Sequence, residues 1–263
     1  ANNQTSSSAT GLSLGVYQVT ASDLNGCVAL SSVSIAEPSV IAANISVTNV
    51  SCNGVSDGSA IAVASGGTPG ASTLYTYDWG SGPVTTNTAT GLMAGLYSVT
   101  INDANSCSVV ETYSISEPSI LVLGISSTAV SCFGGNDGTA TVIPSGGVGG
   151  FSFVWNNGQT NSTAIGLSSG QYCVTVTDGN ACTIDTCVQV SEPAVLSTVS
   201  FLVTDASCNA TCDGQISASA TGGTQSYSFL WSDGQTNAIA TGLCAGGYAV
   251  TITDANGCTT IGN

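Results

Sequence analysis

Cysteine is the residue whose type and spacing in this chain point most directly to chemistry. The chain has 11 cysteines and no histidine. Zinc sites combine cysteine with histidine at tight spacings, so the missing histidine disfavours zinc. Cysteines at repeating positions favour disulfides, which persist in oxidising compartments. The sequence therefore predicts an extracellular or cell-surface protein whose small domains are held by disulfide bonds.

Six cysteines follow the period of an internal repeat, and we expect them to bond within repeats. Four strands are predicted between the members of each pair, an even number that would return the chain to the same end of a domain. Closing a loop of about 50 residues would contribute roughly 4 kcal/mol on the chain-entropy model. The expected pairs are Cys52 with Cys107, Cys132 with Cys182, and Cys208 with Cys258.

An alternative pairing joins adjacent repeats and requires the chain to double back at each junction, so it is less favoured. Its pairs are Cys27 with Cys52, Cys107 with Cys132, and Cys182 with Cys208.

The remaining cysteines are private to single repeats. Cys173 and Cys187 flank a turn symmetrically, which predicts a cross-strand bridge. Cys212 and Cys244 occur together only in the last repeat, and this co-occurrence predicts that they pair. Cys27 is left unpaired, and we expect its partner in the missing half of the truncated unit to which residues 1–38 belong.

Six aspartates recur with the same period and are predicted to lie in turns. Turn carboxylates could bind calcium, and the expected disulfides would bring the two turns of a repeat to one end. Calcium takes about six to eight oxygen ligands, however, and two carboxylates are few. We favour aspartates that accept hydrogen bonds from their own turns, with calcium as the alternative and no other cofactor. These residues are Asp57, Asp103, Asp137, Asp178, Asp213 and Asp254.

The charge composition excludes several function classes. The chain has no lysine, arginine or histidine against 15 acidic residues, for a formal net charge of −15. It therefore lacks the cations that bind nucleic-acid phosphates or anionic lipid surfaces. Histidine-based triads and lysine or arginine phosphate clamps are also impossible. A pair of carboxylates could serve a glycosidase, but the carboxylates recur in turns and junctions, so we predict no enzymatic activity. No apolar run is long enough to cross a membrane.

The same passage recurs four times and predicts the fold. Its closing cysteines are 80, 75 and 76 residues apart, which indicates one folding unit copied in tandem. In each copy apolar residues such as Val99 and Ile101 alternate with Thr and Ser, the pattern of a strand with one buried face. The preceding Gly-x-Tyr resembles the tyrosine corner of immunoglobulin-like sandwiches. We predict an all-β array of immunoglobulin-like (PKD- or fibronectin-like) β-sandwich repeats of about 76 residues, with six or seven strands each.

Glu-Pro pairs mark the predicted junctions, because proline after a strand stops further pairing. They occur at Glu37–Pro38, Glu117–Pro118 and Glu192–Pro193. The predicted domains are a partial repeat at 1–38, which is the C-terminal half of a truncated unit, the first repeat at 39–118, the second repeat at 119–193, and the third repeat at 194–263, which lacks its C-terminal end.

Each full repeat has one tryptophan ahead of a hairpin turn, at Trp79, Trp155 or Trp231. This position is typical of the core aromatic of an immunoglobulin-like fold. The alternative is a platform for carbohydrate, to which Tyr75 and Tyr77 could also contribute, although both are predicted to lie in a strand.

Several motifs together resemble the SprB repeat, which occurs in very large surface adhesins and other secreted proteins of Bacteroidota, some exported by the type IX system and used in gliding motility. The motifs are 50–54 (VSCNG), 56–58 (SDG), 231–236 (WSDGQT), 242–248 (GLCAGGY) and 253–258 (TDANGC). The resemblance covers essentially the whole chain. Family members usually contain some lysine and arginine, so their absence here is a departure.

The resemblance implies a structural or adhesive extracellular segment that forms a disulfide-stapled rod or surface filament. Its expected partners are neighbouring repeats, identical chains in a filament and surface glycans, without nucleic acid or direct membrane insertion. The alternative is a carbohydrate-binding or spacer module of a larger secreted enzyme.

Overall fold

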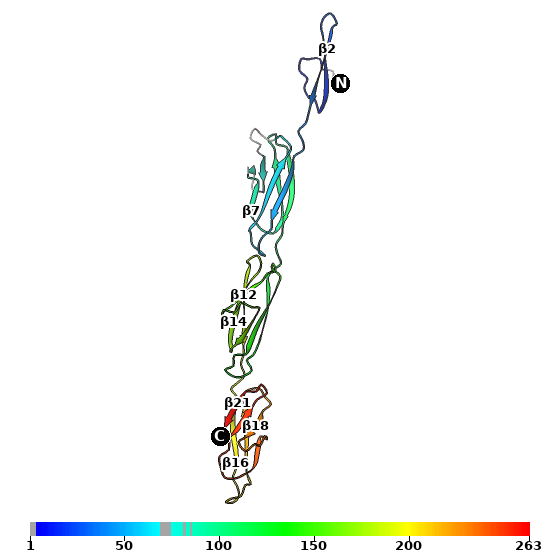
Figure 1. The fold of residues 1–263 in the computed structure, drawn as a ribbon. Coiled ribbons are helices and arrows are strands. Elements are labelled where there is room, and N and C mark those ends of the chain that lie inside the picture. The colour runs from blue at the N-terminus through cyan, green and yellow to red at the C-terminus, as the bar shows by residue number, and fades with distance from the viewer. Residues whose placement is uncertain (1–3, 69–74, 81–82, 85) are drawn as a thin grey trace. The chain divides into compact units, whose positions relative to one another are not determined.

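A computed structural model describes residues 4–68, 75–80, 83–84 and 86–263; residues 1–3 of the predicted partial repeat lie outside this set. Every regular element in the described residues is a β-strand (Figure 1). This confirms the all-β prediction, and the strands are rich in the β-branched residues that suit a pleated, half-buried surface. Contacts divide the chain into two compact units, Ala1–Glu117 and Pro118–Asn263, with the boundary at a Glu-Pro pair.

The second repeat is a sandwich of two antiparallel three-stranded sheets. One sheet has the order β10-β11-β13 and the other the order β12-β14-β15. Their inner faces meet in one core, where Val142, Trp155 and Val174 are each 1% exposed. The strands are β10 (Val122–Thr128), β11 (Gly138–Ser145), β12 (Ser152–Trp155), β13 (Thr163–Leu167), β14 (Gly170–Thr177) and β15 (Thr183–Val190).

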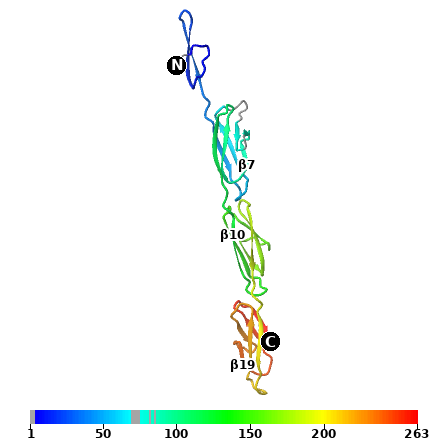
Figure 2. The ribbon, with the colours of Figure 1, turned by 180° about the vertical axis from the view of Figure 1, so that it is seen from behind.

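The third repeat has the same topology, with sheets β16-β17-β19 and β18-β20-β21. Its core contains Ala240, Val250 and Ile252, all fully buried. Figure 2 shows β10 and β19, which belong to corresponding sheets of the second and third repeats, from the opposite side. The strands are β16 (Ser197–Thr204), β17 (Gly214–Thr221), β18 (Ser228–Trp231), β19 (Ile239–Leu243), β20 (Val250–Thr253) and β21 (Thr259–Gly262).

The first repeat adds a seventh strand to this plan. Its sheets are β3-β4-β7 and β6-β5-β8-β9, and the additional strand is the two-residue β6. The core includes Ala60, Val99 and Ile101, all fully buried. The strands are β3 (Ala42–Thr48), β4 (Gly58–Ser65), β5 (Thr76–Asp78), β6 (Pro83–Val84), β7 (Thr88–Leu92), β8 (Gly95–Asn102) and β9 (Ser108–Ile115).

We call one passage of the chain from one end of the sandwich to the other a crossing. In the second repeat, β12 and β13 together make a single crossing. Trp155 at the end of β12 pairs with Val174 in the middle of β14. Thr163 at the start of β13 pairs with Thr141 in the middle of β11. Each of these short strands therefore spans about half of the sandwich, and the chain changes sheet between them.

The partial repeat consists of one hairpin, formed by β1 (Gly15–Ser22) and β2 (Val28–Ile35). It corresponds to β8 and β9 of the first repeat but has no second sheet among the described residues. Val19 is 60% exposed and Val33 57%, whereas their counterparts Val99 and Tyr113 are 0% and 8% exposed. The hairpin thus presents the face that the full repeats bury.

The tyrosine corner predicted from Gly-x-Tyr is present in all four copies. In the second repeat the hydroxyl of Tyr172 donates to the carbonyl of Ser168 at 3.2 Å. The corresponding donors and acceptors are Tyr17 to Ser13, Tyr97 to Met93, and Tyr248 to Cys244. This bond fixes the entry to the strand that carries the buried Val and Ile residues.

Candidate functional site

The cysteines form a junction between repeats that the sequence did not predict. Cys132 of the second repeat is bonded to Cys258 of the third, across 126 residues, with the two Cα atoms 5.7 Å apart. Cys52 and Cys182 each take part in a disulfide as well. The free cysteines are Cys27, Cys107 and Cys208, all exposed.

The expected bonds within repeats are therefore wrong. Cys107 and Cys208 are free, and Cys132 and Cys258 bond to each other rather than to Cys182 and Cys208. The physical reason lies in β12 and β13, which together make one crossing, so three crossings separate Cys132 from Cys182. An odd number of crossings puts these two cysteines at opposite ends of the sandwich.

The alternative pairing between adjacent repeats is also wrong. Cys27, Cys107 and Cys208 each belong to one of its pairs, and all three are free. That pairing had the right relation between repeats, but it joined the wrong members. The structure joins Cys132, the first cysteine of the second repeat, to Cys258, the turn cysteine of the third.

Two predicted bonds are confirmed. Cys173 and Cys187 face each other directly across the β14–β15 pair and are bonded. Cys212 and Cys244 are bonded within the third repeat. Each of these bonds lies within one repeat, whereas the Cys132–Cys258 bond joins two repeats.

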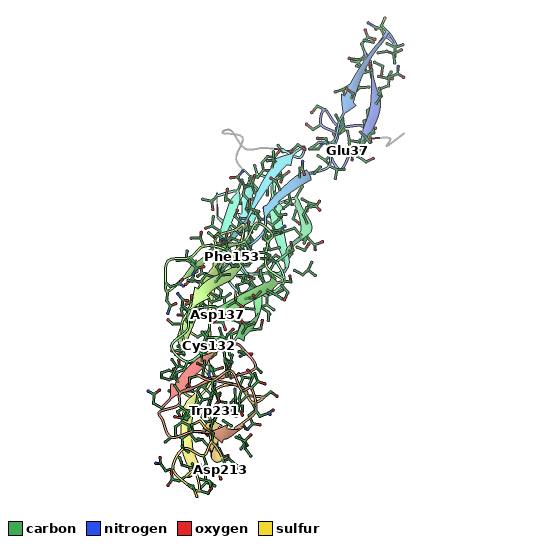
Figure 3. The ribbon with its side chains drawn as sticks, turned by 60° about the horizontal axis from the view of Figure 1, so that its bottom comes forward. Glu37, Cys132, Asp137, Phe153, Asp213 and Trp231 are labelled. Atoms are coloured by element: carbon green, nitrogen blue, oxygen red, sulfur yellow. A yellow bond between two sulfur atoms is a disulfide. The ribbon has the colours of Figure 1, made fainter. Side chains whose placement is uncertain are left out.

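The junction is formed by two short segments, which recur in the other repeats. The first is the cysteine loop, residues 131–137 in the second repeat, with counterparts at 51–57 and 207–213. The second is the cysteine turn, residues 254–258 in the third repeat, with counterparts at 23–27, 103–107 and 178–182. Figure 3 shows Cys132 where the second repeat meets β21, and Asp213 at the far end of the third repeat.

A polar contact accompanies the Cys132–Cys258 disulfide. The side-chain amide of Asn256 donates to the carbonyl of Ser131 at 3.0 Å and to the hydroxyl of Thr224 at 2.9 Å. A hollow of about 400 Å³ beside the bond is lined by both cysteines and by Phe133. The cysteine turn of the third repeat is thus held by a covalent bond and by hydrogen bonding.

An aspartate shapes each cysteine loop. In the second repeat, Asp137 accepts a hydrogen bond from the Ser131 backbone N–H at 2.9 Å and another from the Ser131 hydroxyl. Both bonds lower the pKa of the Asp137 carboxyl, and the bond from the Ser131 hydroxyl has the larger effect. The other loops make the same pair of bonds, between Ser51 and Asp57 and between Ser207 and Asp213.

A second, buried aspartate shapes each cysteine turn of the full repeats. Asp178 is 5% exposed. Its Oδ2 accepts from the backbone N–H of Val148, and its Oδ1 from those of Asn180 and Cys182, all at 2.9 Å. The Val148 bond is the strongest of the influences that lower the pKa of Asp178, against an opposing effect of burial. The same bonding lowers the pKa of Asp103 and Asp254.

The two aspartates of one repeat lie at opposite ends of the sandwich. Asp137 directly precedes β11, and Asp178 contacts the turn that follows β11, where a Cβ on Gly147 would come within 2.7 Å of its Oδ2. A strand of this length spans about 25 Å. The prediction that both turns of a repeat lie at one end is therefore wrong. No group of three or more potential metal ligands occurs within the described ranges.

Two further residue types that matter here were not assigned a role from the sequence. The Glu192 carboxylate accepts from the Gly134 backbone N–H at 2.9 Å and so ties the Glu-Pro junction to the cysteine loop. The Gln159 side chain donates to the Ile165 carbonyl at 2.8 Å and accepts from its N–H at 3.0 Å. The sequence did offer one signal for these two residues. Glu192 recurs in Glu-Pro pairs and Gln159 in Gly-Gln-Thr segments, both at the period of the repeat.

The aromatic residues belong to the cores, as predicted for the tryptophans. Trp155 and Trp231 are 1% and 2% exposed, and Trp79 is half-buried against the first core. Tyr77 is buried, and the half-buried Tyr75 donates its hydroxyl to the Gly66 carbonyl at 2.7 Å. None of these five rings forms an open platform.

Parts of the chain match the model of a known repeat family. The family model described as the SprB repeat matches residues 44–84, 124–160 and 200–236. The SprB-repeat model thus matches one segment in each of the three full repeats. Each matched segment starts in the first strand of a full repeat and includes its cysteine loop. No curated protein is detectably similar to the chain in sequence.

Solved structures of multi-domain proteins match the chain at low identity. Three N-terminal domains of the outer capsid protein Hoc of bacteriophage RB49 are 14% identical, with a TM-score of 0.44, over 84% of this chain and 95% of that one. Fibronectin(III)-like modules of Clostridium thermocellum CbhA are also 14% identical, with a TM-score of 0.27, over 57% of this chain and 94% of that one. These likenesses concern the fold alone. Within the described residues, no helix is long and apolar enough to cross a bilayer.

Proposed function

We propose that this SprB-repeat array is a load-bearing extracellular segment that projects or anchors an adhesive cell-surface protein. The observation that carries the proposal is the Cys132–Cys258 disulfide, which joins consecutive repeats rather than closing one of them. The oxidising location that disulfides require is consistent with a cell-surface role. The binding of surface glycans or other ligands is the adhesive part of the proposal.

The junction disulfide changes how tension passes through the chain. A force that reaches Cys132 can cross directly to Cys258 through the sulfur–sulfur bond. The intervening residues then lie in a closed loop that cannot lengthen, even if their sandwich unfolds. Each extended residue adds about 3.4 Å. Two other disulfides inside this 126-residue separation already close loops of 14 and 32 residues. The junction bond itself therefore withholds about 270 Å of extension from the applied force.

Single-molecule force spectroscopy tests this proposal on the full chain. One handle is attached through a non-cysteine chemistry at the exposed Ile120 and the other at the C-terminus. Between these points the oxidised chain should lengthen only through the few residues outside the loop. The double variant Cys132→Ser/Cys258→Ser should lengthen by about 270 Å more, because the Cys173–Cys187 and Cys212–Cys244 bonds stay closed.

The control is the double variant Cys173→Ser/Cys187→Ser. It removes a disulfide inside the loop, so its extension between the same handles should equal that of the parent. Full extension of the oxidised parent would show that the junction bond carries no load and would sink the proposal.

A further inference from the structure

The outer face of one sheet in the second repeat carries no charge. This face belongs to the sheet β10-β11-β13, which we call the neutral sheet. None of the 15 carboxylates of the chain lies within the described strands of the neutral sheet or of its counterparts, β3-β4-β7 and β16-β17-β19. Acidic residues do occur in strands of the opposite sheets, at Asp78, Glu111 and Asp185. In this acidic chain, the neutral sheet is therefore a surface that can meet another acidic chain without placing charge against charge.

Aliphatic side chains stand on the outer face of the neutral sheet. An antiparallel sheet with one buried face usually alternates apolar residues inside with polar residues outside. In the neutral sheet, Val122, Ile143 and Ile165 point outward and are 48%, 65% and 63% exposed. Their strand neighbours Val142 and Ala164 face the core. Exposed aliphatic side chains gathered on one face are typical of a surface that another molecule covers.

A projecting side chain and a gap lie next to each other on this face. Ile143 in β11 pairs directly with Gly124 in β10. Gly124 has no side chain, and a Cβ built there would meet nothing within 4 Å except the Ile143 carbonyl oxygen, at 3.7 Å. Side-chain positions paired in this way are about 5 Å apart. Ile143 therefore stands about 5 Å from an open position with room for one side chain.

The threonine hydroxyls of the same face are already paired with each other. Thr128 and Thr139 lie 2.8 Å apart, and Thr141 and Thr163 lie 3.0 Å apart, each pair joined by a hydrogen bond between hydroxyls. A hydroxyl with a partner on its own face is not left unsatisfied when water leaves. The absence of charge removes the largest remaining desolvation penalty. Both features lower the free-energy cost of covering the face.

We propose that the neutral sheet packs against the neutral sheet of a second copy, with Ile143 of each copy seated over Gly124 of the other. A two-fold axis that runs along the strands, midway between β10 and β11, exchanges the two positions and makes both contacts at once. The interface is therefore isologous. This inference goes beyond the proposed function, since it concerns association between copies and not the load path within one.

The size of the face predicts a weak contact. Three strands about 4.8 Å apart and about 25 Å long cover roughly 350 Å². Stable complexes bury about 800 Å² per partner. One pair of neutral sheets should therefore associate with a dissociation constant on the order of 0.1 mM or above. Copies held side by side on one surface would associate more strongly, because their effective concentration is higher.

Sedimentation equilibrium of the full chain tests the proposal, at concentrations from about 0.01 to about 1 mM. The free thiols are first capped with iodoacetamide, so that no disulfide can form between copies. The apparent mass of the parent should rise with concentration. It should rise further at about 0.15 M than at about 0.01 M salt, because salt screens the repulsion between chains of net charge −15.

Two variants with the same added charge locate the contact. Ile143→Asp should lower the association constant at least about tenfold, because it places a carboxylate in the covered face. The matched control is Val154→Asp, which adds the same charge at an exposed position in β12 of the opposite sheet. Its association constant should stay within about twofold of that of the parent.

A third variant separates the proposed fit from non-specific hydrophobic association. Gly124→Val adds apolar surface and a residue that suits a strand, so non-specific association would increase. If Ile143 of the second copy needs the gap, the association constant should instead fall at least about tenfold. The double variant Gly124→Ile/Ile143→Gly should restore association, because the projecting side chain and the gap only exchange places.

Circular dichroism establishes that each variant is folded before its association is compared. A parent that stays monomeric up to about 1 mM would overturn the proposal, whatever else the face binds. A Gly124→Val chain that associates more strongly than the parent would also overturn it. So would a folded Gly124→Ile/Ile143→Gly chain that stays monomeric, or equal losses for Val154→Asp and Ile143→Asp.

Discussion

At the scale of single residues, the aspartates organise the loops that the disulfide joins. Asp178 and Asp254 are buried, and the chain has no cationic side chain that could pair with them. Backbone N–H groups supply the compensating positive dipoles. The sequence predicted this role, because Asp followed by Asn and Gly is turn chemistry. It could not show that Oδ2 of Asp178 reaches Val148, which lies 30 residues away. That contact depends on how the sheets pack.

The buried aspartates should make stability depend on pH. The pKa of Asp178 is lowered in the folded chain, so its stabilisation is present above the unfolded value of about 3.9 and is lost as pH falls through the folded value. Asp178→Asn, which places an amide group or its oxygen against the Val148 N–H without the charge, should lower the melting temperature at pH 7. The difference from the parent should shrink below about pH 4.

Asp185→Asn is the matched control, because it removes one negative charge from an exposed position in the same repeat. Its melting temperature should stay close to that of the parent from pH 3 to pH 7. A constant difference for Asp178→Asn over this range would contradict the assigned hydrogen bonds.

The two hydrogen bonds between the Gln159 side chain and the Ile165 backbone form a glutamine clamp, whose contribution should be measurable as a free energy of unfolding. Gln159→Ala removes two side-chain hydrogen bonds to Ile165 and should destabilise the second repeat by about 1 kcal/mol. Gln171→Ala, at an exposed position in β14, serves as the control and should stay within about 0.5 kcal/mol of the parent. Urea unfolding followed by tryptophan fluorescence measures both variants, and equal effects would contradict the clamp.

At the scale of elements, the alternation of Val and Ile with Thr and Ser predicted the strands that form the inner faces. Tyr172 and its counterparts predicted the corner from local sequence alone, because acceptor and donor are four residues apart. The disulfide pairing failed because it depended on the number of crossings. Residues 152–167 contain two strand signals, but β12 and β13 divide one crossing between the sheets. The local sequence pattern of a strand is the same whether the strand spans the whole length of the sandwich or only half of it.

The hairpin of the partial repeat should be the least protected element. Isolated hairpins are marginally stable in water, and the apolar face of β1 and β2 is exposed. Amide hydrogen exchange should show residues 15–35 protected on the order of a hundredfold less than residues 95–115, their counterparts in a complete sandwich. Equal protection would mean that another surface covers the hairpin in solution.

At the scale of the whole molecule, the account rests on one covalent relation between consecutive repeats. The cysteines at repeating positions predicted an oxidising environment, recurrence predicted tandem repeats, and the motifs of those repeats predicted the resemblance to the SprB repeat. The relation itself came from the structure, because Cys132 and Cys258 are 126 residues apart and adjacent only once both sandwiches have formed. The same relation supports the proposed load path through the chain.

Peptide mapping of the native, unreduced protein tests this relation most directly. The chain has no lysine or arginine for trypsin, so pepsin is used, at an acidic pH that also suppresses thiolate-driven exchange. Mass spectrometry should find the peptide with Cys132 linked to the peptide with Cys258. A Cys132 peptide linked to Cys182 or Cys107 would contradict the account.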